Sequence, residues 1–136
     1  MRIRLVAALG STALAATALA GAPAAEARAA AAEHFRVAVG NTWTDGTVTF
    51  YNRSVLVEGV HRSVSAANRM TCRNTLARTV NASGPMVSKV SSDIACGNTR
   101  KFSFVVRADR PGGATAVEVC LTDANSTELK CHVVLS

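Results

Sequence analysis

Short runs of alternating apolar and polar residues follow one another from Phe35 to the C-terminal end of the sequence. Clusters of Gly, Pro, Asn and Asp interrupt these runs roughly every 8–12 positions, a spacing typical of all-β proteins. Alternation indicates a strand because successive side chains point to opposite faces of a sheet. The pattern predicts strands over residues 35–39, 47–51, 54–61, 71–80, 86–92, 101–107, 114–122 and 129–135.

Seven or eight short strands within about 100 residues are typical of two packed sheets. We therefore expect an all-β fold, an immunoglobulin- or fibronectin-like two-sheet sandwich. In 71–80, the residues Thr71, Arg73, Thr75 and Thr79 share a face, and its polar composition predicts a solvent-exposed sheet surface. The dipeptide Asp45-Gly46 predicts a turn that precedes the strand 47–51.

The N-terminal segment has the pattern of a cleavable secretion signal. Arg2 and Arg4 supply a positive start, an uncharged Ala- and Leu-rich run follows, and several Ala-x-Ala triplets offer cleavage sites. The run of about 15 residues is shorter than the roughly 20 that span a bilayer. We expect residues 1–29 to be a signal peptide, cut after Ala27 or Ala29. Residues 30–136 would then form a single secreted, extracellular domain that leaves the membrane.

All four cysteines, Cys72, Cys96, Cys120 and Cys131, lie in this predicted domain. An even number in a short exported chain favours disulfides. Of the three possible pairings we favour Cys72–Cys96 and Cys120–Cys131, because Cys120 and Cys131 flank the turn-forming residues 123–126 almost symmetrically. The wide spacings do not suit a metal site, so we expect no bound metal and no cofactor.

The charge of the chain excludes few partners. The whole sequence has a net charge of +6. Loss of the predicted signal would leave 12 basic and 8 acidic residues, a net charge of about +4. This charge lacks the concentrated basic footprint of a nucleic-acid binder, although weak attraction to anionic wall polymers stays open.

No catalytic motif accompanies the three histidines, His34, His61 and His132. The serines near His61 are not in a Gly-x-Ser-x-Gly turn, and we interpret all three histidines as strand or surface residues. We expect no enzyme activity. Trp43 and Tyr51 break the strand alternation, and exposed aromatic residues often mark binding surfaces, so these two are the candidate ligand contacts.

Two stretches resemble small exported β-sandwich proteins of high-GC actinobacteria, a group of uncharacterised function. These are Val48-Thr49-Phe50-Tyr51-Asn52-Arg53-Ser54 and Ala108-Asp109-Arg110-Pro111-Gly112-Gly113-Ala114, together with the Ala-rich signal and the preference for Arg over Lys. The resemblance implies a class of protein and no mechanism.

Two functions agree best with these patterns. The first is a non-catalytic extracellular module that binds a protein, a glycan or a wall polymer. The second is a secreted inhibitor of an enzyme such as a protease, which would need an exposed loop held near a disulfide. For that role we expect the loop to be residues 81–88, which precede Cys96.

Overall fold

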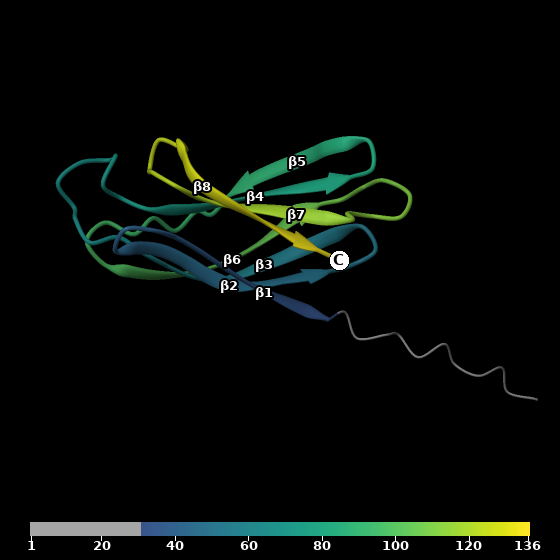
Figure 1. Ribbon diagram of the computed structural model, residues 1–136, viewed down its shortest axis with the longest axis horizontal. Coiled ribbons are helices and arrows are strands. Elements are labelled where there is room, and N and C mark those ends of the chain that lie inside the picture. The colour runs from purple at the N-terminus through teal and green to yellow at the C-terminus, as the bar shows by residue number, and fades with distance from the viewer. Residues whose placement is uncertain (1–30) are drawn as a thin grey trace, which may run out of the picture.

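The computed structural model describes residues 31–136, which form eight strands in two packed antiparallel sheets (Figure 1). The first sheet has the order β1 (Ala32–Val39), β2 (Thr42–Phe50), β3 (Ser54–Arg62) and β6 (Thr99–Arg107). The second has the order β5 (Gly84–Val90), β4 (Asn74–Asn81), β7 (Ala116–Thr122) and β8 (Glu128–Leu135). The predicted two-sheet sandwich is therefore confirmed. The predicted signal peptide, residues 1–29, lies outside the described residues.

The two sheets interlock through the pairs β3–β6 and β4–β7. The chain runs from β3 to β4 by changing sheets, and it makes the same change from β6 to β7. The B–E and C–F pairs of immunoglobulin sandwiches are related in this way. At one side of the sandwich, the edge strand β1 of the first sheet contacts the edge strand β8 of the second. At the other side, β6 of the first sheet contacts β5 of the second.

The core lies between the sheets and consists mainly of Val and Phe side chains. Phe102, Phe104 and Val106 of β6 face this core, as do Val117 and Val119 of β7. Each buried side chain of this kind contributes about 1.5–3 kcal/mol relative to an exposed one. The alternation of β6 and β7 in the sequence thus predicts their buried faces correctly.

Both predicted disulfides are present. Cys120 and Cys131 lie directly opposite each other in the β7–β8 hairpin. Cys72 and Cys96 join the connection before β4 to the connection before β6, next to an isolated bridge between Arg73 and Ala95. Neither bridge crosses the core in the manner of the immunoglobulin B–F disulfide.

The predicted solvent exposure of the Thr-rich face of residues 71–80 is wrong. Thr75 and Thr79 face the opposite sheet and are completely buried. The Thr79 hydroxyl donates a hydrogen bond to the Arg107 carbonyl at 2.9 Å, and the Thr75 hydroxyl contacts the Thr44 hydroxyl at 2.7 Å. Burial of these hydroxyls is tolerated because each has a partner across the sandwich.

The predicted turn at Asp45-Gly46 is also wrong, since both residues lie inside β2. The chain turns instead between β1 and β2, where Gly40 has a φ of 57°. Gly46 stands opposite Gly59 of β3, and a Cβ atom on Gly46 would lie 2.0 Å from the Glu58 carbonyl oxygen. Gly46 is therefore needed for the close approach of two strands.

No helix in the described part of the chain is long and apolar enough to cross a bilayer.

Candidate binding surface

His61 is buried between the sheets and joins a small polar cluster. Its Nδ1 atom lies 3.0 Å from the Thr75 hydroxyl, which in turn contacts Thr44. The His61 ring stacks on Phe102 with 5.1 Å between the ring centroids. Its Nε2 atom is buried and has no hydrogen-bond partner among the described residues.

Desolvation lowers the pKa of His61 from 6.5 to about 4, and the backbone and charge of Asp93 oppose this shift without cancelling it. The imidazole is therefore neutral at neutral pH. Because the side chain is completely buried, it holds the sheets together and is not accessible to a substrate in this conformation. The other two histidines, His34 on β1 and His132 on β8, are exposed.

Trp43 lies on the outer face of the first sheet, among basic side chains. It is half-buried, and the Arg36 guanidinium lies 5.2 Å from its ring centroid in a cation–π contact. Its direct neighbour on β3 is the exposed Arg62, which pairs with Thr99 of β6. The exposed Lys101 is the outward-facing residue that follows Thr99 on β6. We call Arg36, Trp43, Arg62 and Lys101 the basic face.

Asp45 is the carboxylate nearest to the basic face by strand register, and the side chains of Arg36 and His34 contact its two oxygen atoms. Arg36 donates a hydrogen bond to it at 2.8 Å, and the His34 Nε2 atom lies 3.0 Å from its other oxygen. Burial alone would raise the pKa of Asp45, but these partners together lower it below 3.8. Asp45 therefore stays charged and fixes the position of Arg36.

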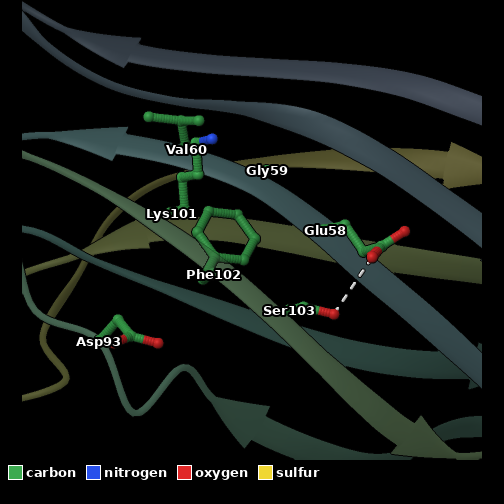
Figure 2. A pocket seen from close by; sticks show the side chains of 7 residues that line it. All are labelled: Glu58, Gly59, Val60, Asp93, Lys101, Phe102 and Ser103. Atoms are coloured by element: carbon green, nitrogen blue, oxygen red, sulfur yellow. Dashed lines mark hydrogen bonds between the residues drawn. The ribbon is translucent and has the colours of Figure 1, made fainter.

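A shallow depression of about 550 Å³ adjoins the basic face (Figure 2). It spans the β3–β6 pair, with Glu58 and Val60 on one strand and Lys101 on the other, and Asp93 borders it from the β5–β6 connection. The Ser103 hydroxyl donates a hydrogen bond to Glu58 at 3.2 Å. Lys101 belongs to both features, so the depression borders the basic face and places the carboxylates Glu58 and Asp93 next to it.

Tyr51, the second predicted contact, is not brought to this surface. Its side chain is 51% exposed, but it follows the end of β2 opposite to Trp43. Eight residues of extended chain separate the two by roughly 26 Å. The two aromatic residues therefore do not form one patch.

The connection between β3 and β4, residues 63–73, is built by its own side chains; we call it the tip loop. Asn68 and Thr71 close a turn in which the Asn68 side chain accepts hydrogen bonds from the backbone of Met70 and Thr71. The Ser63 hydroxyl contacts the carbonyls of Ser65 and Thr71 at 2.8 and 2.7 Å. A loop with this many local bonds has little conformational freedom to lose on binding.

The tip loop is also fastened to its neighbours at the same end of the sandwich, on the left in Figure 1. Arg69 donates hydrogen bonds to Asn125 and to the Ala124 carbonyl in the β7–β8 connection. The Cys72–Cys96 disulfide and a hydrogen bond from the Gly97 backbone to Ser63 hold it to the β5–β6 connection. The end of the sandwich is thus a cross-linked unit.

Two large apolar side chains project from the tip loop. Val64 is 53% exposed and Met70 is 68% exposed. Neither residue was predicted from the sequence, because a single apolar residue between strands carries no periodic signal. The nearby Cys72 is the one feature of the sequence that indicates a constrained loop.

Within the described residues, the one group with metal-ligand spacing is Glu118, Cys120 and Cys131. Its two cysteines form a disulfide, so neither sulfur is a thiolate that could bind a metal ion. We therefore assign no metal centre to it.

No model of a known protein family matches the chain, and a search of curated proteins finds no match. Among solved structures, the chain resembles part of an endonuclease/exonuclease/phosphatase from Beutenbergia cavernae DSM 12333, with 18% identity and a TM-score of 0.46. The likeness covers 76% of this chain and only 27% of that chain. It assigns neither a family nor an activity.

Proposed function

We propose that the protein is an exported, non-catalytic binding module whose contact surface is the tip loop together with the adjoining basic face. The observation that carries this proposal is the exposure of Val64 and Met70 on a loop that a disulfide and hydrogen bonds hold rigid. A partner that covered these two apolar side chains would gain free energy from their removal from water.

The arrangement favours binding for a physical reason. Association costs free energy when loops and side chains become ordered, and a loop fixed in advance avoids much of that cost. Rigid sandwiches commonly present binding loops at one end, as the antibody variable domains do with their B–C and F–G loops. The tip loop and the β7–β8 connection occupy the corresponding places here.

A pull-down with the immobilised domain tests the proposal. Cell-wall material and extracellular proteins of the producing organism are passed over the wild type, over a Val64→Ser/Met70→Ser variant and over a Val133→Ser/Leu135→Ser variant. Val133 and Leu135 are also exposed, but they lie on β8. We expect a partner that binds the wild type and the β8 variant and is lost from the tip-loop variant. Finding no partner in either fraction, or equal loss from both variants, contradicts the proposal.

Export itself is tested separately. We expect the culture medium to contain a chain that begins at residue 28 or 30 and carries no free thiol, because the signal pattern predicts cleavage after Ala27 or Ala29. Mass spectrometry of the intact secreted protein measures both properties. An uncleaved precursor in the membrane fraction would contradict export and leave the binding surface untouched.

An inhibitor of extracellular proteases is the second candidate. An inhibitory loop needs a disulfide nearby. The predicted loop, residues 81–88, does not have one, because the β4–β5 turn lies at the end of β4 opposite to Cys72. The segment 64–67 meets it better: it is mostly exposed, it lies between strands, and it precedes Cys72. Such a segment could enter the active-site cleft of a protease without losing much conformational freedom.

A screen against extracellular proteases tests this candidate. We expect micromolar or tighter inhibition that weakens when Val64 is replaced by Asp, with Val133→Asp as the control. Inhibition that is absent at micromolar concentration, or that survives Val64→Asp, rules it out.

A further inference from the structure

We infer that the basic face binds a flexible phosphodiester-linked polymer of the cell surface. This inference rests on the proposed binding function and names a class of partner for the basic-face part of the contact surface. The structural basis is the outer face of the first sheet, where Trp43 lies between Arg36 and Arg62 and where Lys101 follows on β6.

Two of the three cationic side chains on this face are available for a partner. Within residues 31–136, Arg62 and Lys101 make no ion pair, whereas Arg36, Arg78 and Arg107 each contact a carboxylate. Arg62 and Lys101 stand in a diagonal relation on β3 and β6, which separates them by about 7–8 Å. Long side chains at that separation can contact successive phosphates of a polymer.

A further cation lies in the tip loop, at the end of the molecule where Arg62 ends β3. Arg69 in the tip loop bonds to neutral groups, so its charge is not cancelled by an ion pair within the described residues. Three carboxylates lie on or beside the face: Arg36 and His34 already occupy Asp45, whereas Glu58 and Asp93 border the adjoining depression next to Lys101. The attraction for an anionic chain therefore rests on the side chains of Arg62 and Lys101, which are unpaired within residues 31–136.

Trp43 favours such a polymer over a single-stranded nucleic acid. Proteins that bind single strands stack bases on open aromatic faces. The Arg36 guanidinium lies over the Trp43 ring, and the side chain is half-buried, so the ring offers little stacking surface. The geometry is suited to charge recognition by phosphate contacts without base stacking.

Trp43 is the only tryptophan of the chain, so its fluorescence reports on this face alone. The experiment titrates the secreted domain with soluble poly(glycerol phosphate) at several salt concentrations, following Trp43 fluorescence and, separately, the anisotropy of dye-labelled polymer. We expect saturable binding that changes the Trp43 signal and weakens between about 50 and 200 mM salt.

A charge-matched pair of variants localises the binding. Arg62→Gln/Lys101→Gln should weaken binding at least tenfold and reduce the slope of log affinity against log salt by about 2, at about 1 per phosphate contact. Lys89→Gln/Lys130→Gln, which removes the same charge from the second sheet, should change affinity less than threefold. Both variants alter exposed positions and should fold normally, which circular dichroism checks.

Four results would overturn the inference: no binding, equal weakening in both variants, binding without a Trp43 response, or equal affinity for a single-stranded DNA of matched charge. Equal weakening would indicate attraction by net charge alone. None of these results affects the tip-loop pull-down, so failure of this inference is distinguishable from failure of the proposed function.

Discussion

The Nδ1 atom of His61 on β3 lies 3.0 Å from the Oγ1 atom of Thr75 on β4, so the two sheets meet at a completely buried polar contact. The burial lowers the pKa of His61 to about 4, whereas the unfolded chain should have the ordinary value near 6.5. At neutral pH the imidazole is uncharged in both states. Between these two pH values the His61 imidazole becomes protonated in the unfolded chain but stays neutral in the folded domain.

We therefore predict that the free energy of unfolding decreases as the pH falls from about 6.5 to about 4, by up to about 3 kcal/mol. Urea unfolding curves measured across this range test the prediction. The carboxyl groups of Asp45 and Asp123, whose pKa values are lowered from 3.8, lose their stabilising contribution only at still lower pH. The two effects occupy separate pH ranges.

Replacement of His61 by Gln identifies the source of this pH dependence. Gln cannot take up a proton, so the variant should have a nearly constant stability between about pH 6.5 and 4, even if it is less stable at pH 7. His132→Gln, at an exposed position of β8, should retain the wild-type dependence. If the free energy of unfolding of the wild type stayed constant over this range, the pKa of His61 would not be lowered in the folded domain.

Gly46 is predicted to be intolerant of any side chain. A Cβ atom there would lie 2.0 Å from the Glu58 carbonyl oxygen, a backbone atom that can move only with β3. We expect Gly46→Ala to destabilise the domain by about 2–4 kcal/mol, measured by chemical denaturation. Gly40→Asn is the control, because Gly40 has open space around it and Asn tolerates its positive φ. Similar stabilities of the two variants would contradict such a close approach of β2 and β3.

The two disulfides should differ in what their removal changes. Loop-closure entropy predicts a loss of about 3.5 kcal/mol for Cys72→Ala/Cys96→Ala and about 3 kcal/mol for Cys120→Ala/Cys131→Ala, because the bridged residues are 24 and 11 positions apart. Partner binding should weaken mainly in the first variant, because its bridge holds the tip loop. The pull-down and a thermal unfolding curve measure the two effects. If the two variants lost the same affinity for the partner and were equally stable, the Cys72–Cys96 disulfide would have no special role in holding the tip loop.

The sequence predicts the strands and the disulfides well because both depend on local patterns. Cys120 and Cys131 flank a turn cluster, and the hairpin that this cluster predicts brings them opposite each other. The Asp45-Gly46 dipeptide misleads because the need for glycine comes from Gly59, on the neighbouring strand. A local turn signal cannot be told apart from a close strand approach without the register.

The candidate surface was only partly predictable for a related reason. Trp43 stands out in the sequence by breaking the alternation, but Arg36, Arg62 and Lys101 join it only through strand pairing across the first sheet. Thr75 was misjudged because hydrophobicity patterns treat a hydroxyl as polar, while its partners His61 and Thr44 come from the other sheet. Pairing and packing information of this kind is absent from local sequence.

The Arg69 side chain joins the tip loop to the β7–β8 connection, and its removal should loosen the loop. Arg69→Met keeps most of the side-chain volume and removes these hydrogen bonds, so residues 64–70 should exchange amide hydrogens faster while the midpoint of thermal unfolding changes little. If the rigid loop is what binds, affinity for the captured partner should fall severalfold through a faster dissociation rate. Arg53→Met, in the β2–β3 turn at the other end of the sandwich, should change neither property. An Arg69→Met variant with faster exchange and unchanged affinity would show that rigidity of the tip loop does not contribute to binding.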